Sequence, residues 1–110
     1  MKAGFVYIVT NQRNGTVYIG STSNLIQRIY QHREGAADGF TTEHGCKRLV
    51  WFKAYDDLQE ARLCERRMKK WNRQWKLREI EDLNPEWDDL FECFRSGLPP
   101  SREHEQRITE

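Results

Sequence analysis

Apolar and polar residues follow one another along the first part of the chain in a way that predicts a β-hairpin. Two short runs near the beginning are rich in β-branched and aromatic residues. Between them stands Asn14-Gly15, a pair that readily takes the positive φ angles that hairpin turns require. We therefore expect an antiparallel hairpin with strands at Phe5–Val9 and Val17–Gly20.

The next part of the pattern is helical. Apolar residues recur over residues 25–30 at the spacing of one helix face. Ser23 or Asn24 can cap this helix at its N-terminus, and Gly35 ends it. Residues 35–45 are polar and contain glycine, so we expect an exposed loop there.

A third strand and a second helix are predicted next. The strand covers Arg48–Tyr55, and Asp57 with Glu60 then resembles a helix-capping arrangement. We expect the helix to run to about residue 71. One apolar stripe along it consists of Ala61, Cys64, Met68 and Trp71.

Another helical pattern covers Arg73–Leu83, and we expect Trp75 and Ile80 to point inward from it. This helix should end at Asn84, because a residue that precedes proline disfavours the helical region. A short turn over residues 87–90, which contains a tryptophan and a leucine, would then close the core.

The length of 110 residues suits one domain with a small core. We assign residues 1–96 to this domain. Residues 97–110 contain a Pro-Pro pair and a mixed-charge run with few apolar side chains, which favours a mobile tail. The formal net charge of +1 does not by itself indicate a nucleic-acid partner, so the local distribution of charge has to carry that argument.

Cysteine usage and hydropathy favour a cytoplasmic protein. Cys46, Cys64 and Cys93 form an odd set without two-residue spacing, which argues against a disulfide framework or a zinc ribbon. His44 and Cys46, two metal-capable residues in one loop, make a poor zinc site, and we assign no metal to the pair. The apolar run at residues 5–9 is too short for a signal peptide, and no segment approaches the roughly 20 apolar residues of a membrane span.

Two triplets flank the predicted turn, and they are Phe5-Val6-Tyr7 and Tyr18-Ile19-Gly20. They are followed at consistent intervals by Arg28, His32, Glu65 and Asn84. With this pattern the chain resembles the GIY-YIG nucleases, and among them the small standalone members, from Phe5 to about Phe91. The second triplet is intact, whereas the first has Phe and Val in place of Gly and Ile at apolar strand positions. The resemblance implies an α/β fold, in which a small three-stranded antiparallel sheet is flanked by helices.

Tyr7 and Tyr18 are the first candidates for catalysis. Phosphodiester cleavage needs a deprotonated nucleophile and neutralisation of charge on the phosphoryl and leaving oxygens. In a hairpin both phenols can project onto a common face, depending on the strand register. A phenol's reference pKa is about 10, so a phenol that acts as a base needs a nearby cation, a metal-bound water or a proton relay. The resemblance assigns the base to Tyr7 and the orientation of phosphate or water to Tyr18, whereas strand tyrosines in general more often pack a core.

Arg28 and His32 are four residues apart on the first predicted helix, so their side chains lie on one face. Arg28 can make a bidentate contact with a phosphate, and His32 can relay the proton of Tyr7 or donate to the leaving group. Taken alone, a solvated arginine and a partly buried histidine explain the same residues. The resemblance places both in the active site.

Glu65 lies at the edge of the apolar stripe of its helix, roughly 80° from the middle of the stripe. Mg²⁺ often takes only one or two protein carboxylates and keeps several waters. The resemblance makes Glu65 the ligand of a Mg²⁺ or Mn²⁺ cofactor. An ordinary surface ion pair with Arg62 or Lys69, each one helical turn away, is the alternative.

Several further residues are candidates for substrate binding. Thr22 and Asn24 can donate hydrogen bonds to a phosphate or cap a helix, and some repair-enzyme relatives carry lysine where Ser21 stands here. The resemblance makes Asn84 a supporter of the active site, although it also simply ends a helix. A basic stripe could follow a phosphate backbone, although charge runs are usually solvated faces. Its members are Arg62, Arg66, Lys69, Arg73, Lys76 and Arg78.

The sequence therefore favours a divalent-metal-dependent endonuclease that hydrolyses DNA phosphodiester bonds. Two alternatives stay open. One is a non-catalytic nucleic-acid-binding or adaptor module that retains the nuclease fold. The other is a nuclease that cuts only when a protein partner supplies substrate specificity.

Overall fold

One antiparallel sheet forms the centre of the molecule. The structure is a computed structural model, which describes residues 2–34 and 45–91. Its strands are β1 (Gly4–Thr10), β2 (Val17–Thr22) and β3 (Arg48–Tyr55), in the order β2-β1-β3. The strand β1 is therefore central, and it pairs antiparallel with both neighbours.

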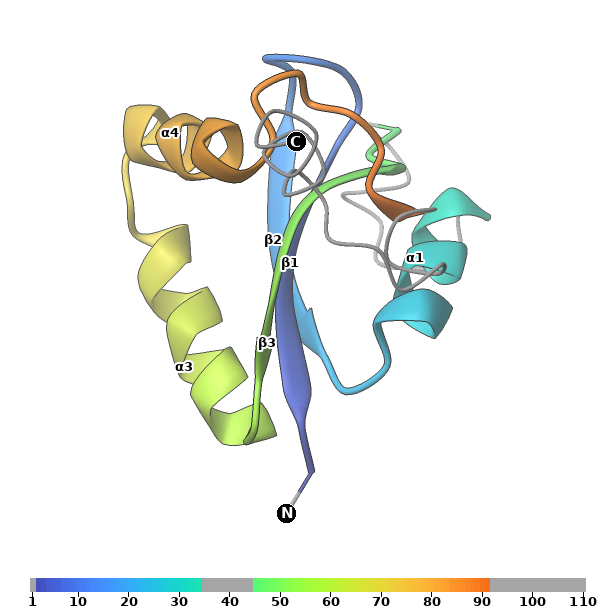
Figure 1. Ribbon diagram of the computed structural model, residues 1–110, viewed down its shortest axis with the longest axis vertical. Coiled ribbons are helices and arrows are strands. Elements are labelled where there is room, and N and C mark those ends of the chain that lie inside the picture. Colours follow the sequence, from blue (N-terminus) through green and yellow to red (C-terminus); the bar gives the residue numbers. More distant parts are fainter. Residues whose placement is uncertain (1, 35–44, 92–110) are drawn as a thin grey trace, which may run out of the picture.

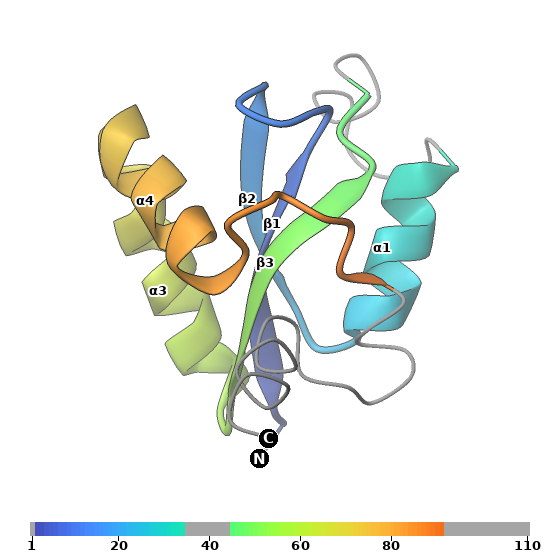
Figure 2. The same ribbon diagram turned by 45° about the horizontal axis from the view of Figure 1, so that its top comes forward.

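Helices cover both faces of this sheet. They are α1 (Leu25–Arg33), α3 (Leu58–Lys69) and α4 (Arg73–Leu83). Figure 1 shows α1 on one side of the sheet and α3 with α4 on the other, and Figure 2 shows the same arrangement after rotation. The predicted fold class, a three-stranded antiparallel sheet flanked by helices, is confirmed.

The hairpin is present, and its strands are longer than predicted. The strand β1 extends by one residue at each end, and β2 continues to Thr22. The connection spans residues 11–16, in which Asn14 takes a φ of 58°. The side-chain oxygen of Asn11 accepts a hydrogen bond from the Thr16 backbone N–H at 3.0 Å, which holds the two ends of this loop together.

Two helices begin at N-cap residues that the sequence predicted. Asn24, one of two candidates, is the N-cap of α1, and its side chain accepts from the backbone N–H of Gln27. Asp57 caps α3 by accepting from the backbone N–H of Gln59. Each contact satisfies a helix-terminal N–H that has no partner inside the helix. The helix α3 ends two residues before Trp71, earlier than expected.

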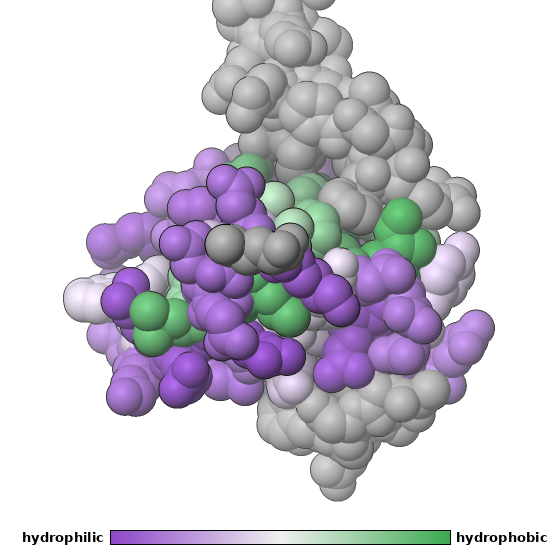
Figure 3. Space-filling view, turned by 90° about the horizontal axis from the view of Figure 1, so that it is seen from below, coloured by the Kyte–Doolittle hydropathy of each residue, from purple (hydrophilic) through white to green (hydrophobic). Residues whose placement is uncertain are grey.

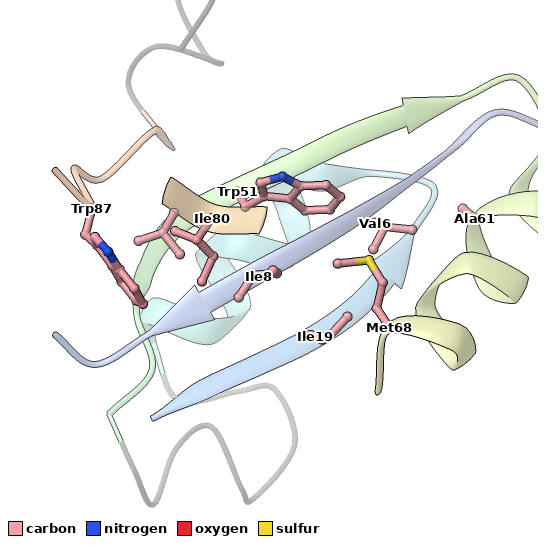
Figure 4. Close-up of a cluster of buried hydrophobic side chains, with 9 residues drawn as sticks. Val6, Ile8, Ile19, Trp51, Ala61, Met68, Ile80 and Trp87 are labelled. Carbon is pink, nitrogen blue, oxygen red and sulfur yellow. The ribbon is translucent and has the colours of Figure 1, made fainter. Parts of the chain in front are cut away.

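The sheet separates two hydrophobic clusters. Val6 and Ile8 of β1 point toward α3 and α4, whereas Tyr7 and Val9 point toward α1. Figure 4 shows the first of these clusters, in which Met68 of α3 points toward Val6 and Ile19. Burial of each such large apolar side chain contributes about 1.5–3 kcal/mol, so both helical layers stabilise β1. The surface in Figure 3 is mostly hydrophilic, with hydrophobic side chains visible in separate places.

Residues 84–91 cross from the α4 side of the sheet to the α1 side (Figures 1 and 2). Trp87 and Leu90 are buried in this segment, so their predicted place in the core is confirmed. The hydrogen-bonded turn lies earlier than expected, because the Trp87 backbone N–H donates to the Asn84 carbonyl oxygen at 3.1 Å. The backbone N–H of Leu90 donates to Leu49 of β3 at 2.7 Å. On the α1 side, the rings of Phe91 and Tyr30 meet edge to face.

The predicted inward orientation of Trp75 is wrong. Trp75 is 54% exposed, whereas Ile80 is fully buried. Residues five apart on a helix lie about 140° apart around its axis, so both cannot face the same sheet. Leu77 and Leu83, each three residues from Ile80, pack against the core instead.

Several predictions concern residues outside the described ranges. They are the body of the loop before β3, the residues His44 and Cys93, the domain boundary at residue 96 and the tail over residues 97–110. Within residues 2–34 and 45–91, no helix is long and apolar enough to cross a membrane.

Candidate active site

The register of the hairpin places both tyrosines on the α1 side of the sheet. Tyr7 pairs with Gly20, and Tyr18 pairs with Val9. Because paired residues share a face and alternate residues along a strand do so too, Tyr7 and Tyr18 are diagonal neighbours. Tyr7 is fully buried, and Tyr18 is partly exposed. The sequence left this register open.

A hydrogen-bonded group connects Tyr7 to α1. The phenol oxygen lies 2.9 Å from Nε2 of His32, and Nε of Arg28 donates to the same oxygen at 3.3 Å. A guanidinium can only donate, so the phenol oxygen accepts from Arg28, and its own O–H can donate to His32 in the tautomer whose Nε2 carries no proton. The predicted spacing of four residues on α1 thus brings Arg28 and His32 to one phenol.

His32 also lies against Tyr18. The ring centroids of His32 and Tyr18 are 5.7 Å apart, and those of His32 and Tyr7 are 5.5 Å apart, both edge to face. Such aromatic contacts stabilise a fixed ring orientation. Tyr7, Tyr18, Arg28 and His32 therefore form one group, which we name the tyrosine cluster.

Gly20 makes room for the phenol of Tyr7. A Cβ atom at position 20 would lie 2.4 Å from the Tyr7 hydroxyl oxygen and 2.6 Å from the ring carbon that carries it. The glycine of the second triplet is therefore required by close packing against the first tyrosine. Sequence reasoning used this glycine as part of a motif and missed its contact.

We expect Gly20→Ala to destabilise the protein by about 1–3 kcal/mol, the usual cost of forcing extra volume into a packed core. Tyr7 is buried and hydrogen-bonded, so it cannot move aside freely. Thermal unfolding measures this cost, and Gly20→Ala in a Tyr7→Phe background is the control. The cost should be smaller there, because the closest contact is removed. An equal cost in both backgrounds would contradict a clash with the Tyr7 hydroxyl.

Glu65 is positioned by contacts on the other side of β2. Ser21, which follows the second triplet, donates its hydroxyl hydrogen bond to Oε1 of Glu65. Lys69 Nζ lies 2.7 Å from Oε2, and the Glu65 side chain is only 19% exposed. Ser21 is a contact that sequence reasoning missed, although its place directly after the triplet was a signal. The carboxylate is thus held at both oxygens.

Lys69 brings Glu65 and the tyrosine cluster to the same edge of the sheet. Its ammonium lies over the Tyr18 ring, 5.6 Å from the ring centroid, while it pairs with Glu65. These groups come from opposite faces, and they meet because β2 is an edge strand of the sheet. The arrangement combines phenols, an imidazole, a carboxylate and two positive charges.

Thr22 and Asn24 have local roles in the structure. The Thr22 hydroxyl accepts from the Asn24 backbone N–H at 3.1 Å and lies 3.3 Å from the Asn24 carbonyl oxygen, to which it donates. Asn24 itself caps α1. Both residues thus shape the entry into the helix that carries Arg28 and His32.

Asn84 is buried at the C-terminal end of α4. Its side-chain amide donates to the carbonyl oxygens of Val50 and Asp88 at 3.1 and 2.8 Å, and its oxygen accepts from the Asp88 backbone N–H. These bonds tie the end of α4 to β3, and they do not connect Asn84 to the tyrosine cluster. Arg62 and Arg66 are exposed on α3.

Comparison with known proteins supports the same family as the sequence motifs do. The GIY-YIG catalytic domain matches residues 3–78. A UPF0213 protein of Clostridium perfringens is 34% identical over 76 residues, which cover 69% of this chain and 81% of that protein. A UPF0213 protein of Staphylococcus aureus is 32% identical over 82 residues, which cover 74% of this chain and 99% of that protein.

A solved structure is also similar. The solution NMR structure of the UPF0213 protein BH0048 from Bacillus halodurans matches with a TM-score of 0.50 and 26% identity, and the match covers 79% of this chain and 92% of that one. The matched GIY-YIG domain covers more than half of the present chain, including the tyrosine cluster and Glu65. This protein therefore belongs to the GIY-YIG nuclease superfamily.

Proposed function

We propose that this protein is a divalent-metal-dependent endonuclease that hydrolyses phosphodiester bonds in DNA. The observation that carries the proposal is the contact of one phenol, Tyr7, with both His32 and Arg28. It combines a candidate base with a proton acceptor and a permanent positive charge. Membership of a nuclease superfamily supports a nucleic-acid substrate.

In this proposal Tyr7 activates the attacking water. The Arg28 guanidinium favours the phenolate electrostatically, and Nε2 of His32 accepts the phenol proton. Tyr7 is buried in the free protein, so substrate binding has to uncover its hydroxyl. Tyr18, which is partly exposed, would orient the phosphate or the water. Arg28 would also stabilise the charge that develops on the phosphoryl group.

We propose that Glu65 would hold the divalent cation, which would take the place of the Lys69 ammonium at Oε2. Its carboxylate is partly buried and already pairs with a positively charged group, the ammonium of Lys69. Within the described ranges, no group of three or more His, Cys, Asp or Glu residues could hold a metal. One carboxylate is sufficient for Mg²⁺ or Mn²⁺ when waters and substrate oxygens complete the ligands. A bound cation would neutralise charge on the phosphoryl and leaving oxygens.

Substrate contacts would come from residues around this site. Arg62 and Arg66 are exposed on α3, where they could pair with backbone phosphates, and Lys69 lies between Glu65 and Tyr18. We propose that Thr22 and Asn24 contribute at the entry of α1. Asn84 would act indirectly, by holding the end of α4 against β3.

A cleavage assay tests the proposal. The purified protein is incubated with labelled single-stranded, duplex, nicked and branched DNA, and with RNA, in Mg²⁺, in Mn²⁺ and in a chelator. We expect products that require the metal, and the substrate panel shows which nucleic acid is preferred. Products in chelator would contradict the metal requirement.

The same assay separates the two alternatives. Binding without any product, with or without metal, would favour a non-catalytic binding module. Products that appear only after a candidate protein partner is added would favour a nuclease that depends on this partner. In the first case the tyrosine cluster would serve structure alone, because its contacts also pack α1 on the sheet.

A further inference from the structure

The corner between α3 and α4 carries an unusual concentration of positive charge. Residues 66–78 contain seven of the chain's 18 Lys and Arg residues and none of its 17 Asp and Glu residues. The remainder of the chain is therefore net acidic. A local surface of this kind attracts a polyanion even when the whole protein is nearly neutral.

Two tryptophans interrupt this basic segment. Trp75 is 54% exposed, more than any other large hydrophobic side chain in the described ranges. Its ring meets the ring of Trp71 edge to face, with centroids 6.2 Å apart. Trp71 in turn packs against the core, so it supports Trp75 in a fixed position.

A hollow lies beside these rings. It is lined by Trp71, Trp75, Arg78 and Glu79, with a volume of about 220 Å³. This volume is below the roughly 300–1,000 Å³ of ordinary ligand pockets, so the hollow suits one flat group better than an enclosed small molecule. An aromatic wall next to a guanidinium is the combination by which proteins hold an unpaired base and its phosphate.

The corner is fixed relative to the candidate active site. Arg73, at the start of α4, donates to the carbonyl oxygens of Asn14 and Gly15, each at 2.8 Å. These carbonyls belong to the loop of the hairpin that carries both tyrosines. The start of α4, which carries Trp75, is therefore attached to the loop of that hairpin.

We propose that the α3–α4 corner binds an unpaired stretch of the substrate strand, with one base stacked on Trp75. This inference rests on the proposed function for its substrate. Lys69, whose ammonium pairs with Glu65, and Trp71, which lines the hollow, are two residues apart at the C-terminal end of α3. A strand that joins the hollow to Glu65 would pass over the C-terminal end of α3, where Lys69 and Lys70 lie. Bases in a duplex are stacked on one another, so duplex DNA cannot use Trp75 in this way.

The test measures binding in a chelator, so that it does not depend on cleavage. A labelled oligothymidylate and a duplex of the same length are titrated with wild-type protein, Trp75→Leu and Trp75→Phe. We expect Trp75→Leu to weaken single-strand binding about tenfold, in keeping with the stacking of one base, and Trp75→Phe to retain most of the affinity. Duplex binding should change less than about twofold, because the phosphate contacts remain.

Tyr30→Leu is the matched control, since Tyr30 is an aromatic residue with 43% exposure on the other side of the sheet. It should leave single-strand binding unchanged. The proposal is overturned if Trp75→Leu binds like wild type, if it loses both substrates equally, or if wild type does not bind the single strand. Trp75-dependent binding without metal-dependent cleavage would instead count against a nuclease that is active on its own and leave this site standing.

Discussion

Replacement of Glu65 by glutamine is expected to lower metal-dependent cleavage by at least about a thousandfold, which corresponds to several kcal/mol of lost charge stabilisation. The amide keeps the shape of the side chain and can still accept from Ser21, but it carries no negative charge for a cation. The Glu65–Lys69 pair is partly exposed, so folding stability should change by no more than about 1 kcal/mol. Single-turnover cleavage and titration with Mn²⁺ measure the two effects.

Glu60→Gln is the control for this substitution. Glu60 lies on the same helix and is exposed in its first turn, so the same charge is removed away from the tyrosine cluster. Cleavage by Glu60→Gln should match wild type. Wild-type-like cleavage by Glu65→Gln would remove the proposed metal role, whereas an equal loss in both variants would indicate a general effect of charge.

Tyr7→Phe is expected to reduce turnover about 10²–10⁴-fold, the usual contribution of a positioned acid or base. The substitution removes only the hydroxyl, and it leaves Nε2 of His32 and Nε of Arg28 without this partner. A stability loss of about 1–3 kcal/mol should accompany it, since a buried hydrogen-bonded group is lost. Cleavage at saturating substrate and DNA affinity in chelator separate turnover from binding.

Tyr55→Phe provides the comparison. The Tyr55 hydroxyl donates to Sγ of Cys64 at 3.0 Å on the α3 side of the sheet, away from the tyrosine cluster. Burial raises the pKa of Tyr55 well above its usual value, so this phenol stays protonated at any assay pH near neutrality. Its removal should affect stability and leave turnover unchanged. If Tyr7→Phe loses binding and turnover equally, Tyr7 is not the base.

The sequence predicts the elements of this fold well, because local signals determine them. The strand Arg48–Tyr55 has the expected bounds, which its β-branched and aromatic residues indicate. The helix Arg73–Leu83 also has the expected bounds, because a proline follows Asn84. Asn24 and Asp57 cap their helices through their own side chains. Such signals act within a few residues, so no tertiary contact is needed to interpret them.

The arrangement of the candidate site is harder to predict, because it depends on contacts across the fold. The hairpin loop over residues 11–16 is longer than a two-residue turn, so Asn14-Gly15 alone does not fix which residue lies opposite Tyr7. The bond between Ser21 and Glu65 joins residues 44 apart in sequence. Trp75 and Ile80 lie about 140° apart around the helix axis, so the sequence alone could have excluded Trp75 from the core. The contact of Trp75 with Trp71 depends instead on how the chain turns between α3 and α4.

The residues of the candidate site are far apart in the sequence, and this distance sets the order in which the site is completed during synthesis. Tyr7 and His32 are 25 residues apart, whereas Glu65 meets Ser21 across 44 residues. During synthesis the N-terminal part becomes available first, so a growing chain presents both tyrosines, Arg28 and His32 before α3 exists. With the roles proposed above, such a chain lacks its metal ligand. We expect the ability to cut to arise only when α3 docks on the sheet and buries Ala61 and Met68, so that incomplete chains leave nucleic acid intact.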